Sequence, residues 1–300
     1  MDLTVGPNPY FWSIEAVREF YAALADAPVE RVVLGEWVCS KRLPFWQDAI
    51  TDAAEVLLGA GKQVALSTLA LITLPRERRQ CAELTQTGLP IEINDLTALT
   101  YLPEGARFWV GPMVNVYNEG TLGWLAGRGA ERVCLPPELP LGSVRRLAAA
   151  GRALGVAIEV WGHGRLPLAI SGRCYHARLH ARSKDSCQFV CVEDPDGRAV
   201  ATIDEQPFLA VNGVQTLSHS TATAALKIPA LREAGVTALR LSPQSRHFAE
   251  ICAGYAAVLH GATRGQEWAD ALQSLVPGGA LSDGFADGPS GAHWSGGPPA

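Results

Sequence analysis

Short apolar runs alternate with helical patterns along most of the chain. Arg31–Glu36 is a β-branched apolar run, for example, and an amphipathic helical pattern over Trp46–Leu58 follows it. About eight such strand–helix units can be counted. The predicted strands are Leu3–Val5, Arg31–Glu36, Gln63–Ser67, Pro90–Asn94, Arg107–Val110, Arg132–Leu135, Val156–Trp161 and Ala238–Leu241. The predicted helices are Ser13–Leu24 with Ser13 as N-cap, Trp46–Leu58, Arg76–Thr85, Thr121–Arg128, Leu141–Leu154, Ala224–Ala234 and His247–Leu259.

Strands that are apolar throughout, rather than alternating, indicate parallel strands covered on both faces. The pattern therefore predicts the α/β class, and about eight units favour a (β/α)8 TIM-barrel-like domain. A doubly wound open sheet is the rival arrangement. No G-x-G-x-x-G motif follows the first predicted strand, so the dinucleotide-binding version of that sheet lacks its usual sign.

An insertion at about 165–220 interrupts the repeat. Asp196-Gly197 and Asn212-Gly213 are typical hairpin-turn dipeptides. Short strands are predicted over Phe189–Val192, Ala199–Ile203 and Phe208–Val211, which together indicate a small antiparallel β insertion. Long insertions in barrels commonly build functional sites. We expect one barrel-like domain over 1–276, and a Gly/Pro-rich tail over 277–300 that is loosely ordered or docked without regular structure.

Charge and hydropathy argue against two classes of protein, nucleic-acid binders and membrane-spanning proteins. The formal net charge is −5, and no cluster of Lys or Arg stands out. This balance argues against a nucleic-acid partner, because such proteins usually carry a basic face. The N-terminal residues do not resemble a secretory signal, and no uninterrupted apolar run is long enough for a membrane span. We therefore expect a soluble, cytoplasmic protein.

The seven cysteines fall into two groups. Cys81, Cys134 and Cys252 lie in apolar or helical surroundings that suit buried core thiols. Cys174, Cys187 and Cys191 follow a C-x12-C-x3-C spacing among polar neighbours, which favours a metal site.

A fourth thiol ligand is available at Cys39. It follows the strand Arg31–Glu36, so it would lie at the C-terminal end of the barrel, where groups distant in sequence meet. Four thiolates suit zinc or an iron–sulfur cluster, and the spacing alone leaves both open.

The segment from Glu159 to Cys174 resembles the signature of the collagenase-like peptidase family, E-x-F-x-H-G-x-x-C-x-x-x-S-G-x-C. Pro167 stands where that signature has its first cysteine. The matching residues are Glu159, His163, Gly164, Ser171, Gly172 and Cys174.

The run Gly164–Ala169, followed by Lys184–Cys187 and Cys191, is similar to one branch of this family. That branch consists of paired subunits in oxygen-independent ubiquinone biosynthesis. The resemblance implies a 4Fe–4S cluster on Cys39, Cys174, Cys187 and Cys191. It also implies a heterodimer with a homologous subunit, acting with other proteins of ubiquinone biosynthesis. The implied activity is anaerobic hydroxylation of a ubiquinone precursor, with prephenate as oxygen donor.

Polar residues at predicted strand ends are candidates for a substrate pocket, because strand ends in a barrel face the site. Arg173, beside Cys174, could bind an anion or balance cluster charge. Asn and Asp are also common in turns and helix caps, which is the alternative explanation. The candidates are Glu36, Asn94, Asp95, Asn115, Asn118, Glu138, Glu159 and Arg173. His163 and His176 are expected to donate hydrogen bonds beside the cysteines rather than to ligate metal.

Two other functions remain open at this stage. One is RNA or tRNA modification, which the family resemblance allows. The other is a non-catalytic scaffold with a structural zinc site. Peptidase action has little support, since no Ser-His-Asp order or H-E-x-x-H motif is present.

Overall fold

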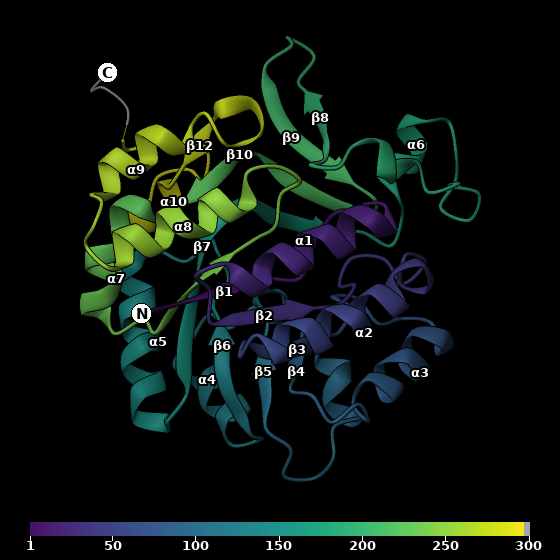
Figure 1. Ribbon diagram of the computed structural model, residues 1–300, viewed down its shortest axis with the longest axis horizontal. Coiled ribbons are helices and arrows are strands. Elements are labelled where there is room, and N and C mark those ends of the chain that lie inside the picture. The colour runs from purple at the N-terminus through teal and green to yellow at the C-terminus, as the bar shows by residue number, and fades with distance from the viewer. Residues whose placement is uncertain (297–300) are drawn as a thin grey trace.

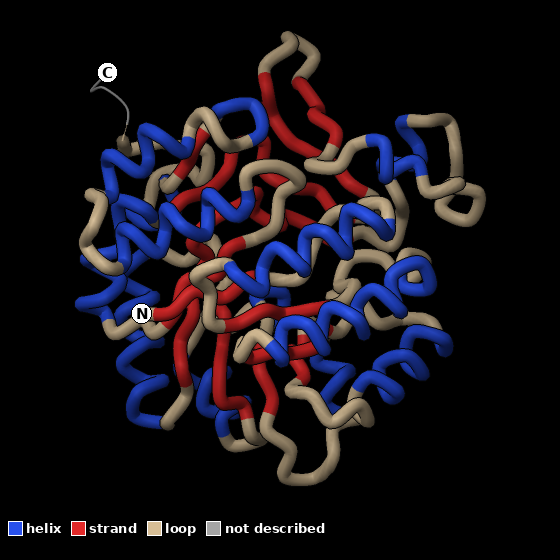
Figure 2. Tube along the Cα trace, viewed as in Figure 1, coloured by secondary structure: helices blue, strands red, loops and turns tan. Residues whose placement is uncertain are grey.

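Eight parallel strands form a closed barrel in the computed structural model, which describes residues 1–296 (Figures 1 and 2). Each strand pairs with its neighbour in parallel, and β11 pairs with both β1 and β7, so the ring closes. The strands are β1 (Asp2–Val5), β2 (Arg31–Leu34), β3 (Gln63–Ser67), β4 (Ile91–Ile93), β5 (Phe108–Val110), β6 (Ala130–Cys134), β7 (Ala157–Ile170) and β11 (Ala238–Leu241). The TIM-barrel-like α/β class predicted from the sequence is confirmed.

Helices surround the barrel and cover the outer faces of its strands (Figure 2). Ser13 caps the first of them, because its Oγ accepts a hydrogen bond from the N–H of Ala16 at 3.2 Å. Between β4 and β5 only a short 3-10 helix is present. The α-helices are α1 (Ile14–Asp26), α2 (Leu43–Gly59), α3 (Pro75–Leu84), α4 (Glu119–Ala126), α5 (Leu141–Leu154), α7 (Ile228–Ala234), α8 (Phe248–Leu259) and α9 (Gly265–Leu272). The 3-10 helices are η1 (Leu96–Thr100), η2 (Pro112–Val114), η3 (Val190–Glu193), η4 (Ala225–Lys227) and η5 (Pro277–Gly279).

A charged triad lies inside the barrel. Arg240 on β11 donates through Nε to Glu159 on β7 at 2.5 Å, and through Nη1 to Glu92 on β4 at 2.9 Å. All three side chains are almost fully buried. Burial alone would raise the pKa of Glu159, but the guanidinium groups of Arg240 and Arg132 outweigh it and hold the pKa below its ordinary value. The triad therefore ties three strands of the ring together as an ionised network.

The insertion grows out of β7, which continues past the barrel to Ile170. There it pairs antiparallel with β10 (Gln215–Thr223), which in turn pairs with β9 (Pro207–Asn212), and β9 pairs with β8 (Arg198–Ala201). The hairpin β8–β9 projects beyond the barrel, and the short helix α6 (Tyr175–Leu179) lies beside it (Figure 1). The predicted antiparallel insertion is thus present at the C-terminal end of the barrel.

Two details of the predicted insertion are wrong. The segment predicted as strand Phe189–Val192 contains η3, because Gln188 and Phe189 adopt left-handed backbone conformations that end any extended run. Asp196-Gly197 does not join two strands, since the β8–β9 turn lies between Ala201 and Pro207. The turn at Asn212-Gly213 joins β9 to β10 as predicted.

The Gly/Pro-rich segment after residue 276 has regular structure, contrary to the expectation for the tail. β12 (Leu281–Ser282) pairs in parallel with β10, and α10 (Gly284–Asp287) follows it. Asp283 fixes the end of this segment by accepting hydrogen bonds from the backbone and hydroxyl of Ser295. Residues 297–300 of the predicted tail lie outside the described residues.

Among residues 1–296, none of the helices combines the length and the apolar character needed to cross a membrane.

We expect Arg240→Leu to lower the free energy of unfolding by about 3–5 kcal/mol, because it removes the guanidinium that bonds to both buried carboxylates. Urea unfolding followed by circular dichroism measures this. Arg18→Leu is the control, since Arg18 pairs with Asp52 on an exposed surface, and should cost at most about 1 kcal/mol. Equal losses in the two variants would contradict the role given to the triad.

Candidate metal centre

The four cysteines predicted as ligands line one small cavity at the C-terminal end of the barrel. Cys39 comes from the loop between β2 and α2, and the other three come from the insertion. Cys174 and Cys191 are buried, whereas Cys39 and Cys187 are partly exposed. We call this space the cysteine cavity. Its full lining is Cys39, Lys41, Arg42, Cys174, His176, Ala177, Lys184, Cys187, Phe189, Val190, Cys191 and Gly213.

Cys174 is held at the start of α6. Its Sγ accepts a hydrogen bond from the N–H of Ala177 at 3.4 Å and donates to the carbonyl oxygen of Gly213 at 3.2 Å. The backbone bond helps to stabilise a thiolate at this position. The β9–β10 turn therefore positions Cys174 from one side, and α6 positions it from the other.

An unusual backbone turn directs Cys187 and Cys191 to the same place. Gln188 and Phe189 both have positive φ values, 48° and 55°, which are uncommon for residues other than glycine. The ring of Phe189 packs against Phe11 and Phe45, with centroids 5.6 and 4.6 Å away. This aromatic packing offsets the cost of the turn and anchors the loop to the barrel.

A buried guanidinium lies among the cysteines. Arg42 is almost fully buried, and its Nη2 donates to Asn212 Oδ1 at 2.6 Å while its Nη1 lies 4.0 Å from Glu36 Oε2. Burial alone would lower the pKa of Arg42, but Glu36, Cys191 and Cys39 raise it. Arg42 therefore places a permanent positive charge beside the thiols.

Gly213 is required for this contact. It has a φ of 66°, and a Cβ atom there would lie 2.2 Å from Arg42 Nη2. A larger residue in the turn would displace the guanidinium.

Glu36 and Asn212 hold the two loops that carry cysteines. Glu36 accepts hydrogen bonds from the backbone of Val38 at 2.6 Å and of Cys39 at 2.9 Å. Asn212 donates to the carbonyl oxygens of Cys191 at 3.0 Å and Asp194 at 2.8 Å. Because Arg42 contacts both side chains, one polar network joins the β2–α2 loop to the insertion.

Burial raises the pKa values of Cys39, Cys174 and Cys191, while the charge of Arg42 acts against that rise. A bound metal would deprotonate these thiols, since thiolate is the ligating form. The donor set fits a metal centre with four thiolates, whose net negative charge Arg42 would partly balance. Lys41 and Lys184 add positive charge at the same cavity.

His176 lies next to the thiols with a carboxylate partner that the sequence did not indicate. Its Nε2 is 3.1 Å from Asp194 Oδ2, and its Nδ1 is 3.3 Å from the carbonyl oxygen of Val211. His180 stacks on its ring at 5.4 Å. The ligand atoms of these three residues lie within 4.8 Å of one another. The contacts with Val211 and Asp194 fix the orientation of the His176 ring beside the cavity.

His163 lies away from the cysteine cavity. It is buried on β7, where its Nε2 is 3.2 Å from Gln244 Oε1 and its ring packs against Tyr255. Its expected place beside the cysteines is therefore wrong, because β7 carries it away from the residues that line the cavity.

The predicted pocket residues do not gather around the cysteine cavity. Glu36 contacts one of its loops, Arg173 directly precedes Cys174, and Glu159 belongs to the barrel triad. Asn94 bonds to Ser67, Asp95 caps η1, Asn118 caps α4, Asn115 ends η2, Glu138 accepts from Tyr117, and Arg173 is exposed. Several of these polar residues thus serve turns and caps.

No pattern in the sequence predicted that Arg42, Asn212 and Asp194 would lie at the site. Arg42 had one available signal, since it follows Cys39 by three positions in a segment expected at the site. Asn212 was recognised only as a turn residue. Asn212 also bonds to Arg42 and to the carbonyl oxygen of Cys191, and no local sequence pattern predicts these contacts between distant residues.

The chain is similar in sequence to known proteins. The model of Peptidase family U32 matches residues 12–296 of this chain. A curated relative, "Collagenase" of Porphyromonas gingivalis (strain ATCC BAA-308 / W83), is 24% identical over 170 residues, which are 51% of this chain and 39% of the relative. The match thus spans well under half the length of that relative.

Among solved structures, the Bacillus megaterium QM B1551 spore cortex-lytic enzyme SleL aligns with a TM-score of 0.27 and 9% identity. The alignment covers 81% of this chain and 71% of that chain. A likeness at this level carries no argument about fold or function.

Asn212→Ala should lower the free energy of unfolding by about 2–4 kcal/mol, because the buried Arg42 and the carbonyl groups of Cys191 and Asp194 each lose a hydrogen-bond partner. Urea unfolding of protein purified without oxygen measures the loss. Gln206→Ala, at an exposed amide of the same insertion, should change stability by no more than about 0.5 kcal/mol. A cost below about 1 kcal/mol for Asn212→Ala would contradict the network described here.

Proposed function

This chain belongs to peptidase family U32, and we propose that it is a 4Fe–4S subunit of the UbiV type. In this proposal the chain supports oxygen-independent hydroxylation of a ubiquinone precursor under anaerobic conditions. The single observation that carries the proposal is the convergence of Cys39, Cys174, Cys187 and Cys191 on one cavity beside the buried Arg42. The proposed reaction comes from the resemblance of Gly164–Ala169, Lys184–Cys187 and Cys191 to the paired-subunit branch of the family.

The four cysteines would hold the cluster, and a cluster supplies one-electron transfer when bound. Four protein thiolates leave no iron site free for a substrate, which favours electron transfer or a structural role over direct activation of the substrate. Arg42 would balance part of the negative charge of the cluster. Glu36 and Asn212 would keep the ligand loops in place through their backbone contacts.

A homologous UbiU-type subunit would complete the assembly as a heterodimer, with prephenate as the oxygen donor. Apolar side chains exposed on the insertion support a partner at this end of the barrel. They are Leu168, Tyr175, Leu179, Val192, Ile203 and Phe208.

Cys187→Ala and Cys191→Ala should each abolish iron binding and anaerobic hydroxylation, because three thiolates from the protein no longer complete the ligand set. Iron content is measured on anaerobically purified protein, and quinone products are measured in cells grown without oxygen. Full iron content together with full hydroxylation in both variants would refute the proposal.

The matched control is Cys252→Ala. Cys252 is fully buried on α8 and does not line the cysteine cavity. This change should cost about 1 kcal/mol of stability through lost packing and leave iron and product levels unchanged.

A further inference from the structure

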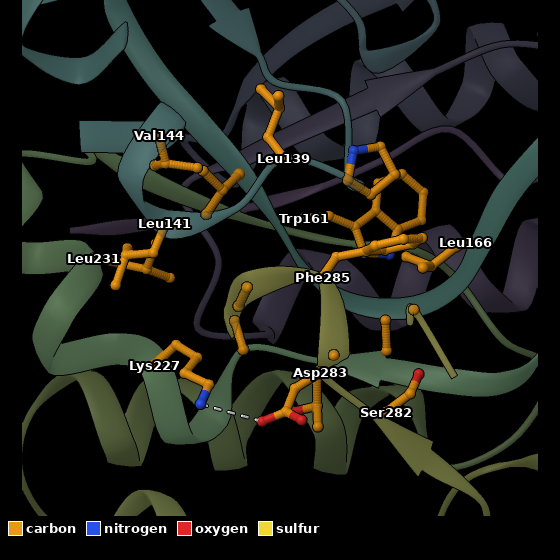
Figure 3. A pocket seen from close by; sticks show the side chains of 18 of the residues that line it. Leu139, Leu141, Val144, Trp161, Leu166, Lys227, Leu231, Ser282, Asp283 and Phe285 are labelled. Carbon is orange, nitrogen blue, oxygen red and sulfur yellow. Dashed lines mark ion pairs between the residues drawn. The ribbon is translucent and has the colours of Figure 1, made fainter. Parts of the chain in front are cut away.

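A second cavity lies next to the barrel mouth, between β7, the loop after β6, α7 and residues 281–291 (Figure 3). Its volume is about 80 Å³, and it opens to solvent. We call it the β7 cleft. The C-terminal end of barrel strands is where ligands bind in this class of fold. The cleft is separate from the cysteine cavity, and the proposed role of the cluster does not use it.

The β7 cleft has two apolar walls of different shape. Leu141, Val144 and Leu231 form an aliphatic side, and Trp161 and Phe285 lie opposite them (Figure 3). Two aromatic side chains facing aliphatic ones make a surface suited to a flat ring.

The residues that close the cleft are held firmly. Phe285 lies on α10, and a Cβ atom at Gly291 would come within 2.3 Å of the Phe285 ring. A Cβ at Gly284 would meet the carbonyl oxygen of Ser290 at 1.9 Å. The C-terminal segment thus folds tightly around Phe285, which fixes the ring against the cleft.

The cleft offers one polar edge, and the charged side chains of that edge are already paired with one another. Lys227 lies 3.5 Å from Asp283 Oδ2 and 2.6 Å from Asp287 Oδ2. A cation paired with two carboxylates does not provide a site for a phosphate or another anion. The chemistry of the cleft therefore suits a neutral ligand with a single polar group.

The apolar packing of the cleft continues to the cysteines. Trp161 and Leu166 line the cleft and belong to the same buried cluster as Cys174. Phe285 packs against this cluster from the cleft side, and Cys39 and Cys187 pack against the same cluster. The β7 cleft and the cysteine cavity therefore border the same buried apolar cluster.

We propose that the β7 cleft binds an aromatic ring that carries an apolar substituent and a hydroxyl group, the class of an alkylated phenol. The ring lies between Val144 and Phe285, and the hydroxyl faces the Lys227–Asp283 edge. The identification of this ring with a ubiquinone precursor rests on the proposed function. If both hold, the β7 cleft is the place where that precursor binds.

Isothermal titration calorimetry with ortho-butylphenol, on the full chain purified without oxygen, tests the assignment. Val144→Phe fills the cleft from α5 and should weaken binding at least about tenfold. Val56→Phe adds the same ring to an exposed position on α2 and should leave binding unchanged. The alcohol n-octanol has a comparable apolar surface but no ring, and should also bind at least about tenfold more weakly than ortho-butylphenol.

Equal binding of the phenol to wild type and Val144→Phe, equal binding of n-octanol, or no binding of the phenol to wild type would each overturn the proposal. If Val144→Phe does not fold, photolabelling of wild type with a diazirine-bearing ortho-alkylphenol replaces it. Label should then appear in the peptides that contain Trp161 or Phe285, and label confined to other peptides would overturn the assignment.

Iron and sulfide are determined on the same samples. Phenol binding by protein without iron would support the β7 cleft as a binding site and contradict the 4Fe–4S cluster. An intact cluster without phenol binding would support the cluster and contradict the assignment of the cleft.

Discussion

The buried guanidinium of Arg42 is the interaction on which the candidate site depends. It reaches Glu36, which holds the loop of Cys39, and Asn212, which holds the loop of Cys191. A charge removed from water is costly unless hydrogen bonds and counter-charges surround it. Arg42 can therefore remain buried only when the barrel loop and the insertion are both in place. The same requirement brings together cysteines that are far apart in the sequence.

The segment Glu159–Cys174, which resembles the family signature, contributes residues to three parts of the structure. It begins at Glu159, which pairs with Arg240 inside the barrel, and continues through Trp161, which lines the β7 cleft. It ends at Cys174 in the cysteine cavity, after β7 has left the barrel to pair with β10. A strand that belongs to both the barrel and the insertion couples the position of the cysteines to the rigid ring of strands. A residue that matches the family signature is therefore not necessarily part of the reacting site.

Local sequence patterns were sufficient to predict the strands and helices of the barrel. They were not sufficient to predict the hydrogen-bond network around the cysteines. Apolar runs and caps predicted strands such as Gln63–Ser67 and the start of α1, because burial and capping act over a few residues. The strand expected at Phe189–Val192 failed because packing of Phe189 against Phe11 and Phe45 stabilises a left-handed turn. The contacts of Arg42 with Asn212 join residues far apart in sequence, so no spacing rule could reveal them. The tail was mistaken for an irregular one because its glycines permit close packing around Phe285 rather than disorder.

The central claim is that four thiolates hold a 4Fe–4S cluster, and elemental analysis tests it most directly. Iron, zinc and acid-labile sulfide would be measured on protein purified without oxygen, together with the visible spectrum before and after exposure to air. About four iron and about four sulfide per chain, with absorbance that bleaches in air, is the result expected for such a cluster. Stoichiometric zinc without sulfide would contradict the claim and turn the cysteine cavity into a structural zinc site.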